Sequence, residues 1–63
     1  MKKHFHFVNP EARFPKMGDR VILTRINDGK MERVETGAAI RVLSDKYGVP
    51  TYVETANSIY EMA

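Results

Sequence analysis

Residues 20–26 form a run of mostly branched side chains, Arg-Val-Ile-Leu-Thr-Arg-Ile, followed directly by Asn27-Asp28-Gly29. Branched residues favour extended strands, and Asn, Asp and Gly tolerate the positive φ angles that a tight hairpin turn needs. This pattern predicts a strand over 20–26 and a hairpin turn at 27–29. The returning segment, residues 30–36, carries only two apolar residues, so it is predicted to be either a weak strand or an exposed loop arm.

The predicted strand has apolar side chains on both faces. Val21 and Leu23 point to one side, whereas Ile22 and Ile26 point to the other. A small barrel has a single interior, so the second apolar row needs cover from elsewhere. The phenylalanines of segment 4–8 are the expected cover within the chain. Without that cover, the second row predicts a homo-oligomer with symmetric contacts.

Further strands are predicted from alternating side chains that lie between turn signals. The N-terminal segment alternates and ends at Asn9-Pro10, because the residue before proline avoids the helical region. Gly37 permits a bulge or a corner, and Asp45-Lys46-Tyr47-Gly48 is typical of a type I turn that closes a hairpin. Besides 20–26, the predicted strands are residues 3–8, 38–44, 51–55 and 58–62.

A helical interpretation of the second half competes with this prediction. Met31, Val34, Ala38 and Val42 are spaced as on one face of a helix, so residues 31–63 could form a helix-turn-helix that binds DNA. Gly37 would then lie inside the first helix, where it costs about 1 kcal/mol relative to Ala. The β-branched residues that follow Pro50 also favour a strand, so the all-β interpretation is preferred.

The order of these elements resembles an SH3-like barrel, with about five short antiparallel strands and an extra N-terminal strand. Within that class, Phe14-Pro-Lys-Met-Gly-Asp-Arg-Val21 is similar to the entry to the first strand of the plasmid-borne type II dihydrofolate reductases. Tyr52-Val-Glu-Thr55 and Ser58-Ile-Tyr60 resemble two later strands of that family. The resemblance implies a pore shared between subunits that holds folate and NADPH. Ile59 and Tyr60 would contact these ligands there, with Ser58 in place of the family's glutamine.

The chain's length and composition limit the remaining possibilities. With 63 residues it is predicted to be one domain, residues 1–63, that buries a small core. It has no cysteine, which excludes a disulfide framework, a cysteine-type zinc site and a thiol nucleophile. A secreted domain of this size usually carries disulfides, so a cytoplasmic location is expected. No apolar run reaches the roughly 20 residues of a membrane-spanning helix, so no membrane association is predicted.

The charges are divided unevenly along the chain. The net charge is +2, with five bases against two acids in residues 1–20 and two acids without a base in residues 47–63. A basic N-terminal segment and an acidic C-terminal segment favour self-association or binding to a mildly anionic partner. The chain lacks the dense Lys/Arg stripe of a strong phosphate binder, so most of these charges are predicted to be solvated surface.

No motif for catalysis or for a metal site is present. His4 and His6 share one face of the predicted strand, but a zinc site needs at least one more ligand, which no spacing supplies. No Gly-x-Ser-x-Gly elbow and no phosphate-binding loop exists, so the chain is not expected to be an enzyme or to hold a metal.

Surface aromatic residues are the most informative candidates for a binding site. In small barrels, exposed aromatic rings stack on bases or line grooves for peptides. A ligand groove is expected if Tyr52 and Tyr60 share an outer face with Arg41. The candidate ligand or partner-binding residues are Tyr52, Tyr60, Ile59, Ser58, Arg41 and Tyr47.

Together these features predict a non-catalytic binding module. It would be an oligomeric small β-barrel that recognises a protein or a nucleic acid, as an accessory protein of a phage or plasmid would. No cofactor is expected. The alternatives are a pore enzyme like the type II dihydrofolate reductases, which would use NADPH, and a helix-turn-helix DNA-binding protein.

Overall fold

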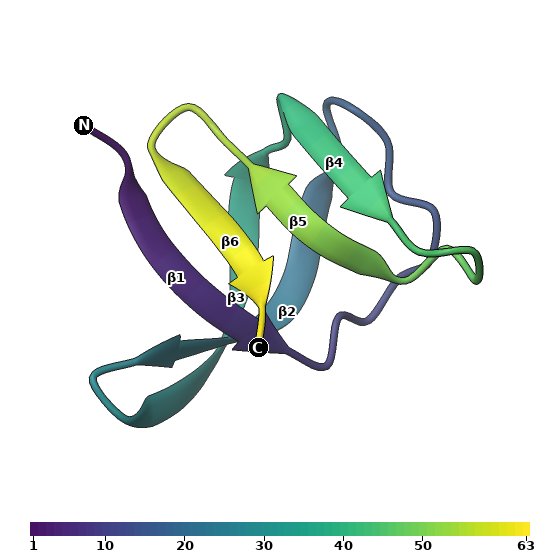
Figure 1. Cartoon of the computed structure of the whole chain (residues 1–63). Coiled ribbons are helices and arrows are strands. Elements are labelled where there is room, and N and C mark those ends of the chain that lie inside the picture. Colours follow the sequence, from purple (N-terminus) through teal and green to yellow (C-terminus); the bar gives the residue numbers. More distant parts are fainter.

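The computed structural model covers residues 1–63 and contains strands only (Figure 1). The all-β prediction is therefore confirmed. The structure contains no helix with the length and apolar character needed to cross a bilayer. The six strands are β1 (Lys3–Val8), β2 (Arg20–Asn27), β3 (Lys30–Ala38), β4 (Arg41–Ser44), β5 (Pro50–Glu54) and β6 (Ser58–Met62).

Strand β1 lies at the centre of the sheet and joins its two halves. The strand order is β3-β2-β1-β6-β5-β4, so β1 connects the β2–β3 hairpin to the β4–β5–β6 meander. It pairs antiparallel with β2 and parallel with β6. The extra N-terminal strand that the sequence predicts is thus confirmed. Its parallel pairing with β6 makes the sheet mixed, which the predicted antiparallel barrel did not include.

The sheet curls into a half-barrel whose edge strands, β3 and β4, are not paired with each other (Figure 1). The chain passes from one edge to the other through a corner at Ala39 and Ile40. The Ala39 N–H donates to the Asp19 carbonyl at 2.9 Å, and the Ile40 N–H donates to the Glu54 carbonyl at 2.7 Å. Backbone hydrogen bonds from both flanks therefore hold this corner, although no continuous ladder closes the barrel.

Both predicted hairpins form, and so does the predicted bulge. Asp28 and Gly29 have φ angles of 51° and 77°, and they form the two-residue turn between β2 and β3. The register of β2 with β3 shifts near Gly37, which is the bulge expected there. At that point the Val21 N–H donates to the Thr36 hydroxyl at 3.0 Å, so a side chain satisfies a donor that the bulge removes from the ladder.

The second half of the chain forms strands throughout. Residues 30–38 make the nine-residue strand β3, and residues 41–62 contain β4, β5 and β6. The two helices of the helix-turn-helix alternative are therefore not formed. The helical spacing does not correspond to one buried face, since Val34 and Val42 pack against the core from two different edge strands whereas Met31 is exposed.

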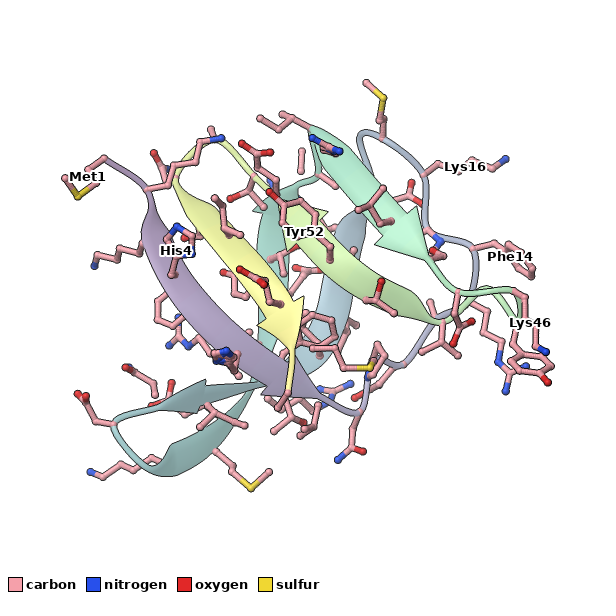
Figure 2. The ribbon with its side chains drawn as sticks, viewed as in Figure 1. Met1, His4, Phe14, Lys16, Lys46 and Tyr52 are labelled. Carbon is pink, nitrogen blue, oxygen red and sulfur yellow. The ribbon has the colours of Figure 1, made fainter.

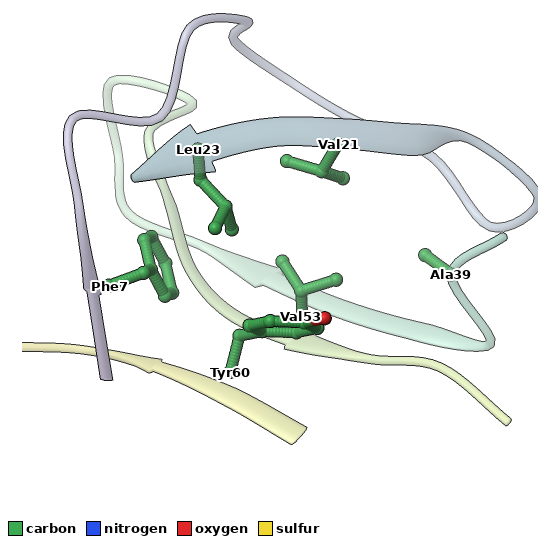
Figure 3. Close-up of a cluster of buried hydrophobic side chains, with 6 residues drawn as sticks. All are labelled: Phe7, Val21, Leu23, Ala39, Val53 and Tyr60. Atoms are coloured by element: carbon green, nitrogen blue, oxygen red, sulfur yellow. The ribbon is translucent and has the colours of Figure 1, made fainter. Parts of the chain in front are cut away.

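The core is small and lies on the concave side of the sheet (Figure 3). Phe7 and Leu23 are fully buried at its centre, and Val53 faces them from β5. Partly buried side chains of Phe5, Val34 and Val42 extend this core towards its rim. Its six buried members are Phe7, Val21, Leu23, Ala39, Val53 and Tyr60.

The expected cover for the second apolar row of β2 is not provided by the phenylalanines. β1 pairs edge to edge with β2, so its side chains extend the faces of that strand and cover neither of them. Phe7 is buried with Leu23 on the concave side, and Phe5 packs against the same core. Ile22 and Ile26 remain half-buried on the convex side. This correction leaves the homo-oligomer a prediction.

Two ion pairs connect segments of the chain that are far apart in the sequence. Lys2 pairs with Glu54, and Arg33 pairs with Glu11 through two hydrogen bonds, of which the Nη2 bond to Oε1 measures 2.9 Å. A hydrogen bond from Lys2 lowers the pKa of Glu54, and a hydrogen bond from Arg33 lowers the pKa of Glu11. Both carboxylates therefore stay ionised to a lower pH in the folded chain than in the unfolded chain.

The lowered pKa values predict a loss of stability in acid. A carboxyl whose folded pKa is depressed contributes stability above its unfolded pKa, and this contribution is lost as the pH falls through the folded pKa. We expect the urea midpoint to fall as the pH decreases below about 4.3, the ordinary carboxyl pKa. Urea unfolding of the wild type and of an E11Q/E54Q variant at several pH values measures this effect. An unchanged pH dependence in the variant would contradict the assignment.

Candidate functional site

The predicted tyrosine groove is divided by the sheet, because Tyr52 and Tyr60 lie on opposite faces. Tyr60 pairs with Val53 and is buried in the core, where its ring stacks on Phe5 with centroids 5.5 Å apart. Tyr52 is next to Val53 in β5, so its half-buried ring points to the convex side. The two rings therefore do not line one groove.

Tyr52 and Arg41 do lie together on the convex side. The Arg41 guanidinium lies 5.8 Å from the centroid of the Tyr52 ring, and the Tyr52 hydroxyl donates to Glu54 at 3.3 Å. Burial, followed by the negative charge of Glu54, raises the pKa of Tyr52. Because Glu54 already pairs with Lys2, this surface is an internally satisfied polar network and offers few free groups to a ligand.

Of the other predicted residues, Ile59 and Ser58 are separated by the alternation of β6. Ile59 pairs with Glu54 and with His4, whose side chains lie on the convex side. Ser58 lines a pocket at the end of the sheet where β1 begins, together with Lys3 and Arg25. His4 and His6 are exposed, and the structure places no group of three metal-ligating side chains together.

A second cluster forms where the connector between β1 and β2 meets the turn between β4 and β5. The Phe14 N–H donates to the Gly48 carbonyl at 2.7 Å, which fixes the connector against the turn. The Asp45 carboxylate accepts the N–H groups of Tyr47 and Val49, so the turn is rigidly shaped. Gly48, with a φ of 81°, is buried beneath the Phe14 ring. This geometry places the connector and the turn on one surface.

That surface presents two exposed aromatic rings, each with cations nearby in the sequence. Phe14 and Tyr47 are 66% and 60% exposed, which is unusual for side chains of this size. The Lys46 ammonium lies 5.1 Å from the centroid of the Tyr47 ring. Figure 2 shows Phe14, Lys16 and Lys46 at the same end of the molecule. We refer to Arg13, Phe14, Lys16, Lys46 and Tyr47 as the basic aromatic tip.

No known relative guides the assignment of this site. Comparison with family models, curated proteins and solved structures finds no match to the chain. The SH3-like and reductase resemblances therefore depend on the residues quoted for them, and the structure adds to them only a curled, barrel-like sheet.

The cations of the basic aromatic tip are free of ion pairs. The four ion pairs of the structure use Lys2, His4, Arg25 and Arg33, all of which lie elsewhere. The two acids near the tip are both occupied in backbone turns: Asp45 caps the β4–β5 turn, and Asp19 accepts the Lys16 N–H at 2.8 Å. The tip therefore has a positive charge that no neighbouring carboxylate neutralises through an ion pair.

Sequence reasoning identified Tyr47 but missed the other residues of the tip. In the sequence, Phe14 stands out only through a family resemblance, and the cations beside it have the pattern of solvated surface charge. The available signal was a large aromatic residue in a connector between two bases, since such residues are usually buried. Its proximity to Lys46 and Tyr47 depends on a contact between segments over 30 residues apart, which the sequence does not reveal.

Proposed function

We propose that the chain is a non-catalytic module that binds single-stranded nucleic acid through the basic aromatic tip. The observation that carries this proposal is the pair of exposed rings, Phe14 and Tyr47, placed on one surface among unpaired cations. Proteins that bind single strands without sequence preference combine stacking platforms with a positive surface that follows the backbone. The tip has both parts.

Each ring has a face that a base can reach. Phe14 covers the backbone of Gly48 with one side of its ring, and its exposure leaves the other side in solvent. Lys46 lies against the Tyr47 ring, and this ring is also mostly exposed. A base in duplex DNA is stacked on both sides, so these rings favour unpaired bases.

The number of tip cations predicts a moderate affinity. Arg13, Lys16 and Lys46 can contact about three phosphates, and each contact releases a counterion when the strand binds. For single strands the slope of log K against log salt is about −0.7 per phosphate, so we expect a slope of about −2. This agrees with a chain that has a local basic patch and only a small net charge.

Oligonucleotide binding tests the proposal directly. Fluorescence anisotropy with a labelled oligothymidylate is expected to show saturable binding that weakens with salt. F14A and Y47A should each weaken the affinity by about tenfold or more, because stacking contributes about 1–3 kcal/mol per base. K46Q should mainly reduce the salt dependence.

Two matched variants show whether the effect belongs to the tip. Y52A removes a tyrosine from the convex face, and K30Q removes an exposed lysine from the β2–β3 turn. Both should bind like the wild type. Equal loss in Y52A and Y47A would contradict the proposed site, and equal affinity for a duplex would contradict the preference for single strands. If the folded chain does not bind the oligothymidylate, the nucleic-acid proposal is wrong, and a protein becomes the expected partner.

A further inference from the structure

The pocket beside Ser58 has a chemistry that the proposed function does not use. It lies where β1 begins and β5 turns into β6, at the opposite end of the view from Phe14 and Lys46 (Figure 2). Its volume is about 460 Å³, within the range of small-molecule sites. The residues that line it are Met1, Lys3, Phe5, Arg25, Asn57 and Ser58.

Strand register explains why these side chains meet. Lys3 pairs with Ser58 across the parallel β1–β6 ladder, and the Lys3 N–H donates to the Asn57 carbonyl at 3.1 Å. Phe5 follows Lys3 on the concave side of β1. Arg25 reaches the same place from β2, with its guanidinium 4.7 Å from the centroid of the Phe5 ring. The pocket is therefore built by three elements of the sheet.

Arg25 is held in place but is incompletely satisfied. Its Nη2 atom donates to Glu32 at 2.7 Å, and its guanidinium lies over Phe5, so its position is fixed from two sides. Its Nε atom is buried without a hydrogen-bond acceptor. A buried donor that lacks a partner is unfavourable, and the effect is larger for a charged group. The Nη1 atom forms no hydrogen bond within the chain either, and the side chain is 24% exposed, so the guanidinium keeps donors for an oxygen atom of a ligand in the pocket.

The other polar groups of the pocket are also donors without protein partners. Lys3 forms no ion pair, because the four ion pairs of the chain involve other bases. The side chains of Asn57 and Ser58 make no hydrogen bonds, although the backbone of Ser58 bonds to Thr55. Glu32 balances the charge of Arg25, so among the side chains of the pocket one positive charge, that of Lys3, is not balanced.

We propose that this pocket binds the oxyanion of a small ligand, a carboxylate or a phosphate. Arg25 and Lys3 contribute charged donors, and Asn57 and Ser58 contribute neutral donors. Phe5 and Met1 give the pocket an apolar side that accommodates the body of an organic anion. This site does not depend on the proposed nucleic-acid function, because the two sites share no residue.

Nuclear magnetic resonance titration tests the pocket on the intact chain. The Arg25 Nε–H resonance and the Lys3 and Ser58 amides are followed while acetate, benzoate or inorganic phosphate replaces chloride at constant ionic strength. We expect saturable shifts of these resonances with at least one oxyanion. A response to phosphate alone, or to the carboxylates alone, identifies the source of the oxyanion. Shifts that stay linear with all three anions would overturn the proposal.

Variants separate specific binding from general attraction of anions. K3Q should weaken binding by about tenfold, the effect of losing one charged hydrogen bond, whereas K46Q, which removes a lysine at the opposite end of the molecule (Figure 2), should not. R25K keeps the charge but removes the planar set of guanidinium donors, and it should weaken binding as well. Equal effects of K3Q and K46Q would contradict the site. An F14A/Y47A variant should bind the anion normally, so the failure of one proposal does not affect the other.

Discussion

Phe7→Ala is expected to lower the free energy of unfolding by about 3–5 kcal/mol, the usual effect of truncating a buried phenylalanine. Phe7 is fully buried at the centre of the core, on the strand that joins the two halves of the sheet. A domain of 63 residues has a total stability of roughly 3–9 kcal/mol. The substitution therefore removes a large part of the stability, and urea unfolding followed by circular dichroism measures it.

Phe14→Ala is the matched control for this experiment, because it makes the same chemical change at a side chain that is 66% exposed. Its effect should stay below about 1 kcal/mol. If the two variants were equally stable, Phe7 would not be the central core residue that the structure indicates. A loss restricted to one half of the sheet would show that the two halves unfold independently of β1.

The central position of β1 explains why the fold was only partly predictable. The hairpins follow from local rules, since Asp28-Gly29 and Asp45 to Gly48 form the turns that their sequences favour. The alternation of Phe5 and Phe7 also predicted a strand. Its partners could not be read from the sequence, because pairing between β1 and β6 joins segments separated by about 55 residues.

The convex row of β2 shows a limit of reasoning from side-chain alternation. Alternation correctly predicts that Ile22 and Ile26 lie on the face opposite Val21 and Leu23, but cover by the phenylalanines requires β1 to pack on a face of β2. An N-terminal strand can instead pair with the edge of β2, which adds hydrogen bonds and leaves both faces as they were. Only the three-dimensional register distinguishes these outcomes.

The candidate sites were less predictable than the strands, and for a related reason. Residue type predicts a shared groove for the tyrosines, but strand alternation puts Tyr60 and Tyr52 on opposite faces of the sheet. Both proposed sites combine a residue considered beforehand, Tyr47 or Ser58, with neighbours brought in by long-range contacts. Chemistry that depends on such contacts becomes visible only in the folded chain.

Gly48→Ala is expected to weaken single-strand binding by about tenfold, as F14A does, although it changes no group that contacts the ligand. Gly48 has a φ of 81°, and a Cβ atom there would lie 2.7 Å from Phe14 Cζ and closer still to two other carbons of the ring. The backbone beneath the ring is fixed by the hydrogen bond between Phe14 and Gly48. The exposed ring therefore has to move, and the stacking platform is lost.

Gly29→Ala provides the control for the backbone. Gly29 has nearly the same φ, 77°, but nothing lies within 4 Å of the position of its Cβ atom. Both variants should lose about 1–2 kcal/mol of stability from the left-handed conformation. Only G48A should lose affinity for the oligothymidylate.

The double variant F14A/G48A completes the test, because G48A acts on binding through Phe14. When the ring is already absent, adding G48A should cause no further loss of affinity, so the two effects are not additive. Independent, additive losses would show that Gly48 contributes to binding in another way. If G48A bound as well as G29A while F14A remained weak, the position of the Phe14 ring over Gly48 would be irrelevant to recognition.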